Sequence, residues 1–192
     1  GQQSLLTGEA GAFYRSNGNA RTANLAATWA SSNVSLNYTG ATSQSDNYEA
    51  GEAFKTTREP GRPGHTLDLD EVGSSAWETR NHTLGLAVRN EQHLLHLSFG
   101  YQDMPYQLYP NQRMDLLDNE QERVNLRYLG EFGAVAVEAR VYRETVDHFM
   151  DFGDDKRFWY GTNSGTGTPC SPIRFHGDPA GTCAAGMPMY TE

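Results

Sequence analysis

The chain has 192 residues, a net charge of −9, 37% hydrophobic residues and 20 glycines. The negative charge argues against a nucleic-acid backbone as partner, because such a partner requires clustered lysine and arginine. No run of about 18 apolar residues exists, so we expect no transmembrane helix, and the opening GQQSLLTGEAG lacks the basic and apolar regions of a signal peptide.

Alternation of apolar and polar residues recurs along the chain and predicts β-strands, because successive side chains on a strand point to opposite faces. The expected strands are 4–16, 21–30, 34–42, 79–89, 93–101, 120–129 and 134–148. The short polar stretches SNGN (16–19), SSN (31–33), NEQ (90–92) and GEFG (130–133) predict turns. Three longer stretches, at about 43–76, 103–118 and 150–192, are expected to be loops.

The strand at 93–101, HLLHLSFGY, shows the pattern most clearly. Leu95, Leu97 and Phe99 fall on one face, and the residues between them are polar or small. In an up-and-down arrangement of these strands, all the long loops fall at one end of the sheet and most of the tight turns at the other. Such sorting is typical of an outer-membrane barrel, and a soluble sandwich has no reason to show it.

The polar face of the expected strands also favours a barrel. Five charged residues share this face: Arg123, Arg127, Glu138, Arg140 and Glu144. Burying them in a soluble core would be costly unless each were paired, whereas a barrel lumen is wet. Aromatic residues near the strand ends on the apolar face would form a membrane-interface girdle: Tyr14, Trp29, Tyr38, Tyr101 and Tyr128. A soluble secreted β-protein remains the alternative.

The predicted fold is all-β, an antiparallel up-and-down meander of about seven strands that is part of a large transmembrane β-barrel. Seven strands do not close a bacterial barrel, and open sheet edges are not tolerated in lipid. We therefore expect residues 1–192 to be one part of the barrel domain of a larger protein, with the missing strands on both sides.

Several segments resemble TonB-dependent outer-membrane receptors. The segments are 79–133, and within it GYQDMPYQLYPNQRMDLLDN (100–119), together with VEARVYRETVDHFMDF (137–152) and GMPMYTE (186–192). They are similar to a subgroup whose wider group takes up copper or iron chelates. The resemblance implies a barrel of about 22 strands filled by a plug, energy supplied through the TonB complex, and a location in the outer membrane of a Gram-negative bacterium. The plug, the TonB-contact segment and the terminal strand are not in this sequence.

Candidate metal ligands lie near the end of the chain. His148 and Met150 are two residues apart, so on an extended segment they point the same way, and Met187 and Met189 repeat this spacing. Met104 is a further candidate. Imidazole and thioether form a soft ligand set that suits copper, above all Cu(I), and the H-x-M pair is similar to one used by copper receptors of the family. The alternative is an H-x-M that arises by chance, with methionines that only pack.

Other residues suggest a ligand entrance. Tyr106, Tyr109 and Arg113 could contact a siderophore or small chelate, or equally pack a loop onto the plug. Cys170 and Cys183 lie in a Gly/Pro/Thr-rich stretch and predict a disulfide in an oxidising compartment, with two free thiols as the alternative.

No Ser–His–Asp set, phosphate loop or Cys-x-x-Cys cluster is recognised, so we expect no enzyme activity and no resident cofactor. The leading function is active uptake of a metal ion or metal chelate. A passive porin or an adhesin-type barrel is the alternative.

The alternation in the strand at 93–101 places Leu97 on the apolar face. It therefore predicts that Leu97→Arg in the full-length protein blocks membrane insertion. Arginine at the midplane of a barrel's lipid face costs about 2–4 kcal/mol. Heat-modifiable migration of outer-membrane fractions on gels measures the folded, inserted form. Normal folding and insertion of this variant would count against contact between Leu97 and lipid.

Overall fold

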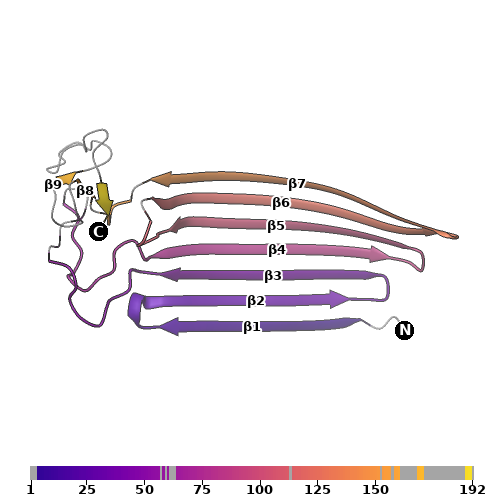
Figure 1. Ribbon diagram of the computed structural model, residues 1–192. Helices are drawn as coiled ribbons and strands as arrows, with labels where there is room; N and C mark the ends of the chain where they lie inside the picture. The colour runs from indigo at the N-terminus through magenta and orange to yellow at the C-terminus, as the bar shows by residue number, and fades with distance from the viewer. Residues whose placement is uncertain are drawn as a thin grey trace.

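A single antiparallel sheet makes up most of the protein (Figure 1). The computed structural model describes residues 4–56, 58, 60, 64–112, 114–151, 153–156, 158–160, 168–170 and 189–191. The strands of this sheet are β1 (Leu5–Arg15), β2 (Ala20–Ala30), β3 (Val34–Ser45), β4 (Trp77–Arg89), β5 (His93–Gln107), β6 (Asp115–Phe132) and β7 (Val135–Asp151). Each strand pairs with its neighbours in chain order, which confirms the all-β antiparallel meander.

The described chain also contains a short helix and a second, small sheet. A 3-10 helix, η1 (Asn17–Asn19), connects β1 to β2, and Gly18 within it has φ 72°, a left-handed conformation that glycine adopts without steric cost. A second sheet has the strand order β10–β8–β9. Its strands are β8 (Phe158–Tyr160), β9 (Thr168–Cys170) and β10 (Met189–Thr191), so the prediction of one long loop over 150–192 is wrong.

Two strands, β5 and β6, extend furthest beyond their predicted ends toward the long loops. β5 runs to Gln107 and β6 begins at Asp115, so the loop expected at 103–118 is limited to 108–114. Cross-strand polar pairs hold these extensions, for example Arg80 to Asp103 at 2.6 Å and Tyr101 to Glu120 at 2.9 Å. The backbone ladder continues here although the apolar alternation has ended, which is why the sequence pattern stopped too early.

The strand register separates the sheet into two faces. One unbroken cross-strand row contains Leu6, Trp29, Leu36, Leu86, Leu97, Leu126 and Val141. We call this the central row, and the face that it occupies the apolar face. The next row on the opposite face, the polar face, contains Thr7, Thr28, Asn37, Gly85, Ser98, Asn125 and Tyr142.

No described segment covers the apolar face. Leu97 at its centre is 42% exposed, and the buried hydrophobic residues of the described chain are only Ala20, Leu67 and Leu116. A soluble sandwich would bury such a row beneath a second layer. The exposed central row is therefore a surface for contact with an apolar medium or partner.

The connections are sorted between the two ends of the sheet. Turns at 31–33, 90–92 and 133–134 close one end, and the long connections 46–76 and 108–114 lie at the other (Figure 1). The Asn90 side chain accepts hydrogen bonds from the backbone N–H groups of Gln92 and His93, at 3.0 and 2.7 Å. The loop sorting expected from the sequence is confirmed.

Among the described residues, we find no helix with the length and apolar character needed to span a membrane.

Candidate functional site

His148 and Met150 lie on β7 and share the polar face, as their spacing predicts. His148 is opposite Asn119 of β6, and Met150 is opposite Leu116. The His148 side chain is exposed, whereas Met150 is half-buried beside the buried Leu116. Both side chains are thus placed on one surface at the loop end of the sheet.

Asn119 orients the His148 imidazole. The His148 Nδ1 atom lies 2.9 Å from the Asn119 side-chain oxygen. Because an amide oxygen only accepts hydrogen bonds, Nδ1 carries the proton and donates it. In a neutral ring the Nε2 atom then keeps its lone pair, and this is the form of histidine that binds a metal ion. A carbonyl partner on the other ring nitrogen is typical of metal-binding histidines.

Met104 joins the same surface through strand pairing. Met104 of β5 is opposite Asn119, so Met104, Asn119 and His148 form one cross-strand row. Two strand spacings, about 10 Å, separate the backbones of Met104 and His148. A thioether and an imidazole that extend toward each other can shorten the distance between their donor atoms. The candidate site therefore contains one imidazole and the thioethers of Met104 and Met150.

The remaining candidates are dispersed. Tyr106 lies on β5 opposite Glu78, on the continuation of the apolar face and away from His148. Tyr109 lies in the 108–114 loop, where its backbone is hydrogen bonded. Arg113, Met187 and Cys183 lie outside the described residues.

Met189 lies on β10 and Cys170 on β9, and their side chains are also outside the described part of the chain. The disulfide and the second methionine pair therefore stay predictions.

A buried ion pair organises the long connections. Asp115 at the start of β6 is 0% exposed and lies 3.0 Å from the Nζ of Lys156, which is 3% exposed. The other Asp115 oxygen accepts a hydrogen bond from the Ser74 hydroxyl at 2.9 Å. Lys156 donates to the Tyr109 carbonyl at 2.6 Å, and the Tyr109 N–H donates to Asp115 at 2.8 Å. Every polar atom of the pair that is taken from water thus gains a protein partner.

Asp155 forms a second centre beside this pair. Its carboxylate accepts hydrogen bonds from the Ser74 N–H at 2.7 Å and the Asn47 amide at 2.8 Å, and it lies 2.6 Å from the His65 Nε2. Burial raises the pKa of the Asp155 carboxyl, but the hydrogen bonds from Ser74, Asn47 and His65 outweigh burial. The pKa of Asp155 therefore lies below its ordinary value.

Three connections that are far apart in sequence are joined by these contacts. The set Asn47, His65, Ser74, Asp115, Asp155 and Lys156 is called the loop cluster below. Asn47 also accepts hydrogen bonds from the N–H groups of Ser75 and Ala76, at 2.9 and 3.0 Å. Sequence reasoning missed this cluster, because no local pattern marks residues that meet only through the fold.

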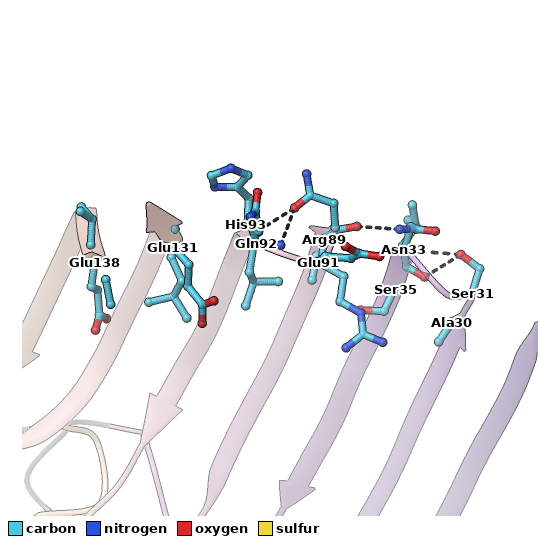
Figure 2. A pocket seen from close by; sticks show the side chains of 18 residues that line it. Ala30, Ser31, Asn33, Ser35, Arg89, Glu91, Gln92, His93, Glu131 and Glu138 are labelled. Carbon is cyan, nitrogen blue, oxygen red and sulfur yellow. Dashed lines mark hydrogen bonds between the residues drawn. The ribbon is translucent and has the colours of Figure 1, made fainter. Parts of the chain in front are cut away.

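A cavity of about 780 Å³ lies at the opposite, turn end of the sheet (Figure 2). Its lining includes Asn33, Arg89, Glu131 and Glu138, which come from four separate parts of the meander. The Asn33 amide donates to the Arg89 carbonyl at 2.9 Å. Since the whole length of the sheet separates this cavity from His148, it is not part of the candidate metal site.

Hard-ligand metal sites are absent from the described ranges. No group of three or more His, Cys, Asp and Glu side chains there is arranged to hold a metal ion. Glu71 and Asp68, in the 46–76 connection, have protein partners instead, since Glu71 accepts a hydrogen bond from the Asn47 amide at 2.9 Å and Asp68 pairs with Arg58 at 3.0 Å.

Comparison with known proteins finds a likeness among solved structures. A solved structure described as copper transporter OprC matches with a TM-score of 0.55 and 25% sequence identity over 78% of this chain. The chain spans only 20% of the length of that transporter. No protein-family model and no curated protein matches the sequence. The sheet therefore resembles, in its architecture, part of an outer-membrane barrel receptor.

The buried ion pair predicts that Lys156→Met destabilises the loop cluster by about 3–5 kcal/mol, because Asp115 would keep an uncompensated buried charge. Hydrogen–deuterium exchange of the 108–116 backbone in the full-length protein measures this change. Lys55→Met is the matched control, since Lys55 lies in the same group of loops but its Nζ has no hydrogen-bond partner in the described chain. Equal exchange in the two variants would refute the role of the pair.

The lowered pKa of Asp155 predicts an acid-labile loop cluster. Its folded-state pKa lies below the unfolded value of about 3.9, so ionised Asp155 contributes stability that is complete above about pH 4. This contribution is lost as the pH falls through the folded-state value. Limited proteolysis between pH 6 and pH 2 should show loop cleavage rising at the acid end. Asp155→Asn should flatten that pH dependence, and an unchanged profile would contradict the assignment.

Proposed function

We propose that this chain is part of the barrel wall of an outer-membrane receptor that takes up a metal ion or metal chelate, with copper as the cargo. The observation that carries the proposal is the placing of His148 and Met150 on one polar surface, with the imidazole oriented by Asn119. The likeness to a copper transporter over 78% of the chain supports it.

The two faces of the sheet fit a barrel wall. The exposed central row suits acyl chains, and the polar face, with Arg127 paired to Glu138 at 2.8 Å, suits a hydrated lumen. Both edges of the sheet, β1 and β7, would then continue into strands of the rest of the receptor, because lipid does not tolerate unpaired strand edges.

The ligand chemistry favours reduced copper over iron. Thioether sulfur is a soft donor that suits Cu(I), and imidazole complements it. Met150, Met104 and the free Nε2 of His148 would supply these donors from β7 and β5. Capture and passage require no covalent bond to form or break, so the proposed role is transport and not catalysis. Energy would come from the TonB complex through parts of the receptor beyond this sequence.

A second cargo class, an iron chelate, depends on aromatic and basic residues near the entrance. The Tyr109 backbone is fixed by Asp115 and Lys156 at the loop end of the sheet. A fixed aromatic residue at a lumen entrance suits a flat organic chelate. Copper remains the preferred cargo, because the soft donors share one described surface.

Replacing both His148 and Met150 with alanine in the full-length receptor should weaken Cu(I) binding by about 10–100-fold or more, since loss even of a residue that only supports a metal ligand has an effect of that size. Competition with a chromogenic Cu(I) chelator measures the affinity. His96→Ala, on the same face but nearer the turn end, is the matched control and should bind normally.

Unchanged copper affinity in the double variant would remove these two residues from the site. Copper accumulation by cells distinguishes a receptor from a passive porin. Only a receptor loses copper accumulation when the TonB complex is deleted. Copper accumulation that persists without TonB would favour the porin.

A further inference from the structure

Two β-bulges border the loop end of β5 and β6. On one side, Met104 and Pro105 of β5 lie opposite the single residue Thr79 of β4. On the other side, β6 has one residue more than β7, Leu117, at the register shift between these two strands. β5 and β6 themselves stay in register with each other, with Met104 opposite Asn119. The two strands therefore leave the regular pairing of the sheet together.

We call this unit the β5–β6 arm, and it consists of residues 103–107 of β5 and 115–119 of β6. A bulge bends its strand and increases the local twist, and bulges are frequent at barrel rims and beside functional sites, where they re-aim a side chain. The arm carries Met104 and also Asn119, the hydrogen-bond partner of His148 Nδ1. How closely Met104 approaches His148 of β7 therefore depends on where the arm is held.

Asp115 of the arm is bound by segments that belong to both neighbouring strands. Ser74, three residues before β4, donates its hydroxyl hydrogen to one carboxylate oxygen at 2.9 Å. Lys156, five residues after β7, places its Nζ 3.0 Å from the other oxygen. A Cβ on Gly153 would collide with the same carboxylate, so the chain after β7 passes directly against Asp115. One buried side chain thus ties the arm to β4 on one side and to β7 on the other.

The same ion pair fixes the connection at the tip of the arm. Lys156 donates to the Tyr109 carbonyl at 2.6 Å, and the Tyr109 N–H donates to Asp115 at 2.8 Å. Asp115 and Lys156 are 0% and 3% exposed, so water does not compete for these bonds. Removal of either charge would leave the other buried without compensation, which is strongly destabilising. The position of the arm therefore depends on both charges.

The ion pair lies next to the donor residues along the strands. Asp115 pairs with Asp151, the residue after Met150, and Leu116 pairs with Met150 itself. A shift of the arm at Asp115 would reach Met150 through one residue pair, and it would reach Met104 through the register of β5 with β6. The three donors thus keep a common geometry only while the arm is fixed.

We propose that Asp115 and Lys156 are positioning residues of the candidate metal site. Their ion pair holds the β5–β6 arm so that the Met104 thioether meets His148 and Met150 on one surface. Neither charged group is a ligand of the metal ion, and the pair acts through the arm alone. This inference rests on the proposed copper cargo and adds the residues that give the site its shape.

A double-mutant cycle in the full-length receptor tests the proposal. Its two changes are Lys156→Leu and Met104→Ala, and leucine is chosen because methionine would add a thioether near the site. Competition with a chromogenic Cu(I) chelator measures the affinity. We expect Lys156→Leu to weaken Cu(I) binding by about 10-fold or more. Met104→Ala should add little in that background, because the thioether is already displaced. Lys55→Leu, in the same group of loops, is the matched control and should leave the effect of Met104→Ala unchanged.

X-ray absorption at the copper edge gives a second readout, the number of sulfur ligands. This number should fall by one in Lys156→Leu, as in Met104→Ala, and stay unchanged in Lys55→Leu. An ion pair that only stabilised the loops would lower the amount of folded receptor without changing the ligands of the bound metal. Additive effects in the cycle, or an unchanged sulfur number in Lys156→Leu, would overturn the proposal.

Carbon-13 NMR of the methionine methyl groups in the metal-free receptor separates this proposal from the cargo. The Met104 signal is assigned by its loss in Met104→Ala, and we expect it to shift or broaden in Lys156→Leu. A Met104 signal that responds in a receptor without Cu(I) binding refutes the cargo alone, whereas a signal that does not respond refutes the positioning role. If Lys156→Leu fails to fold, Ser74→Ala provides a milder test, since it removes only the hydroxyl that donates to Asp115.

Discussion

The unbroken antiparallel register from β1 to β7 is the constraint on which the rest of the structure depends. Directly paired residues on neighbouring strands point to the same face. Because the register pairs apolar residues with apolar residues across all seven strands, their side chains form continuous rows. A slip of one residue in any pair would move a whole strand's apolar set to the polar face. The register also builds the candidate site, since it alone places Met104, Asn119 and His148 in one row.

The loop cluster has a different physical basis. The sheet offers no apolar interior, so the long connections are held by buried polar groups that satisfy one another. Hydrogen bonds to Ser74 and Tyr109 offset the cost of burying Asp115 and Lys156. Asp155 joins the chain after β7 to the connection before β4. In the proposed receptor, rigid connections at this end would hold the surroundings of the candidate donor site in a defined shape, which favours binding by a preorganised surface.

In the proposed receptor, binding and membrane contact would occupy opposite faces of the same strands. In β5, Met104 belongs to the polar face and Leu97 to the apolar face. In β7, His148 and Val141 divide in the same way. A strand can serve both purposes because its side chains alternate, so in the proposed receptor a wall one strand thick would separate the cargo path from lipid. The likeness to part of a copper transporter is consistent with this division of labour.

The sequence by itself determined the two faces, the antiparallel meander and the sorting of loops, because the period-two pattern of residues such as Leu95, Leu97 and Phe99 is a local property of a strand. It also placed His148 and Met150 together, since their spacing lies within one strand. Only the tertiary structure decided the length of β5 and β6, the placing of Met104 in the same cross-strand row as His148, and the loop cluster. These depend on backbone pairing and on contacts between residues as distant as Asn47 and Asp155, which no local pattern encodes.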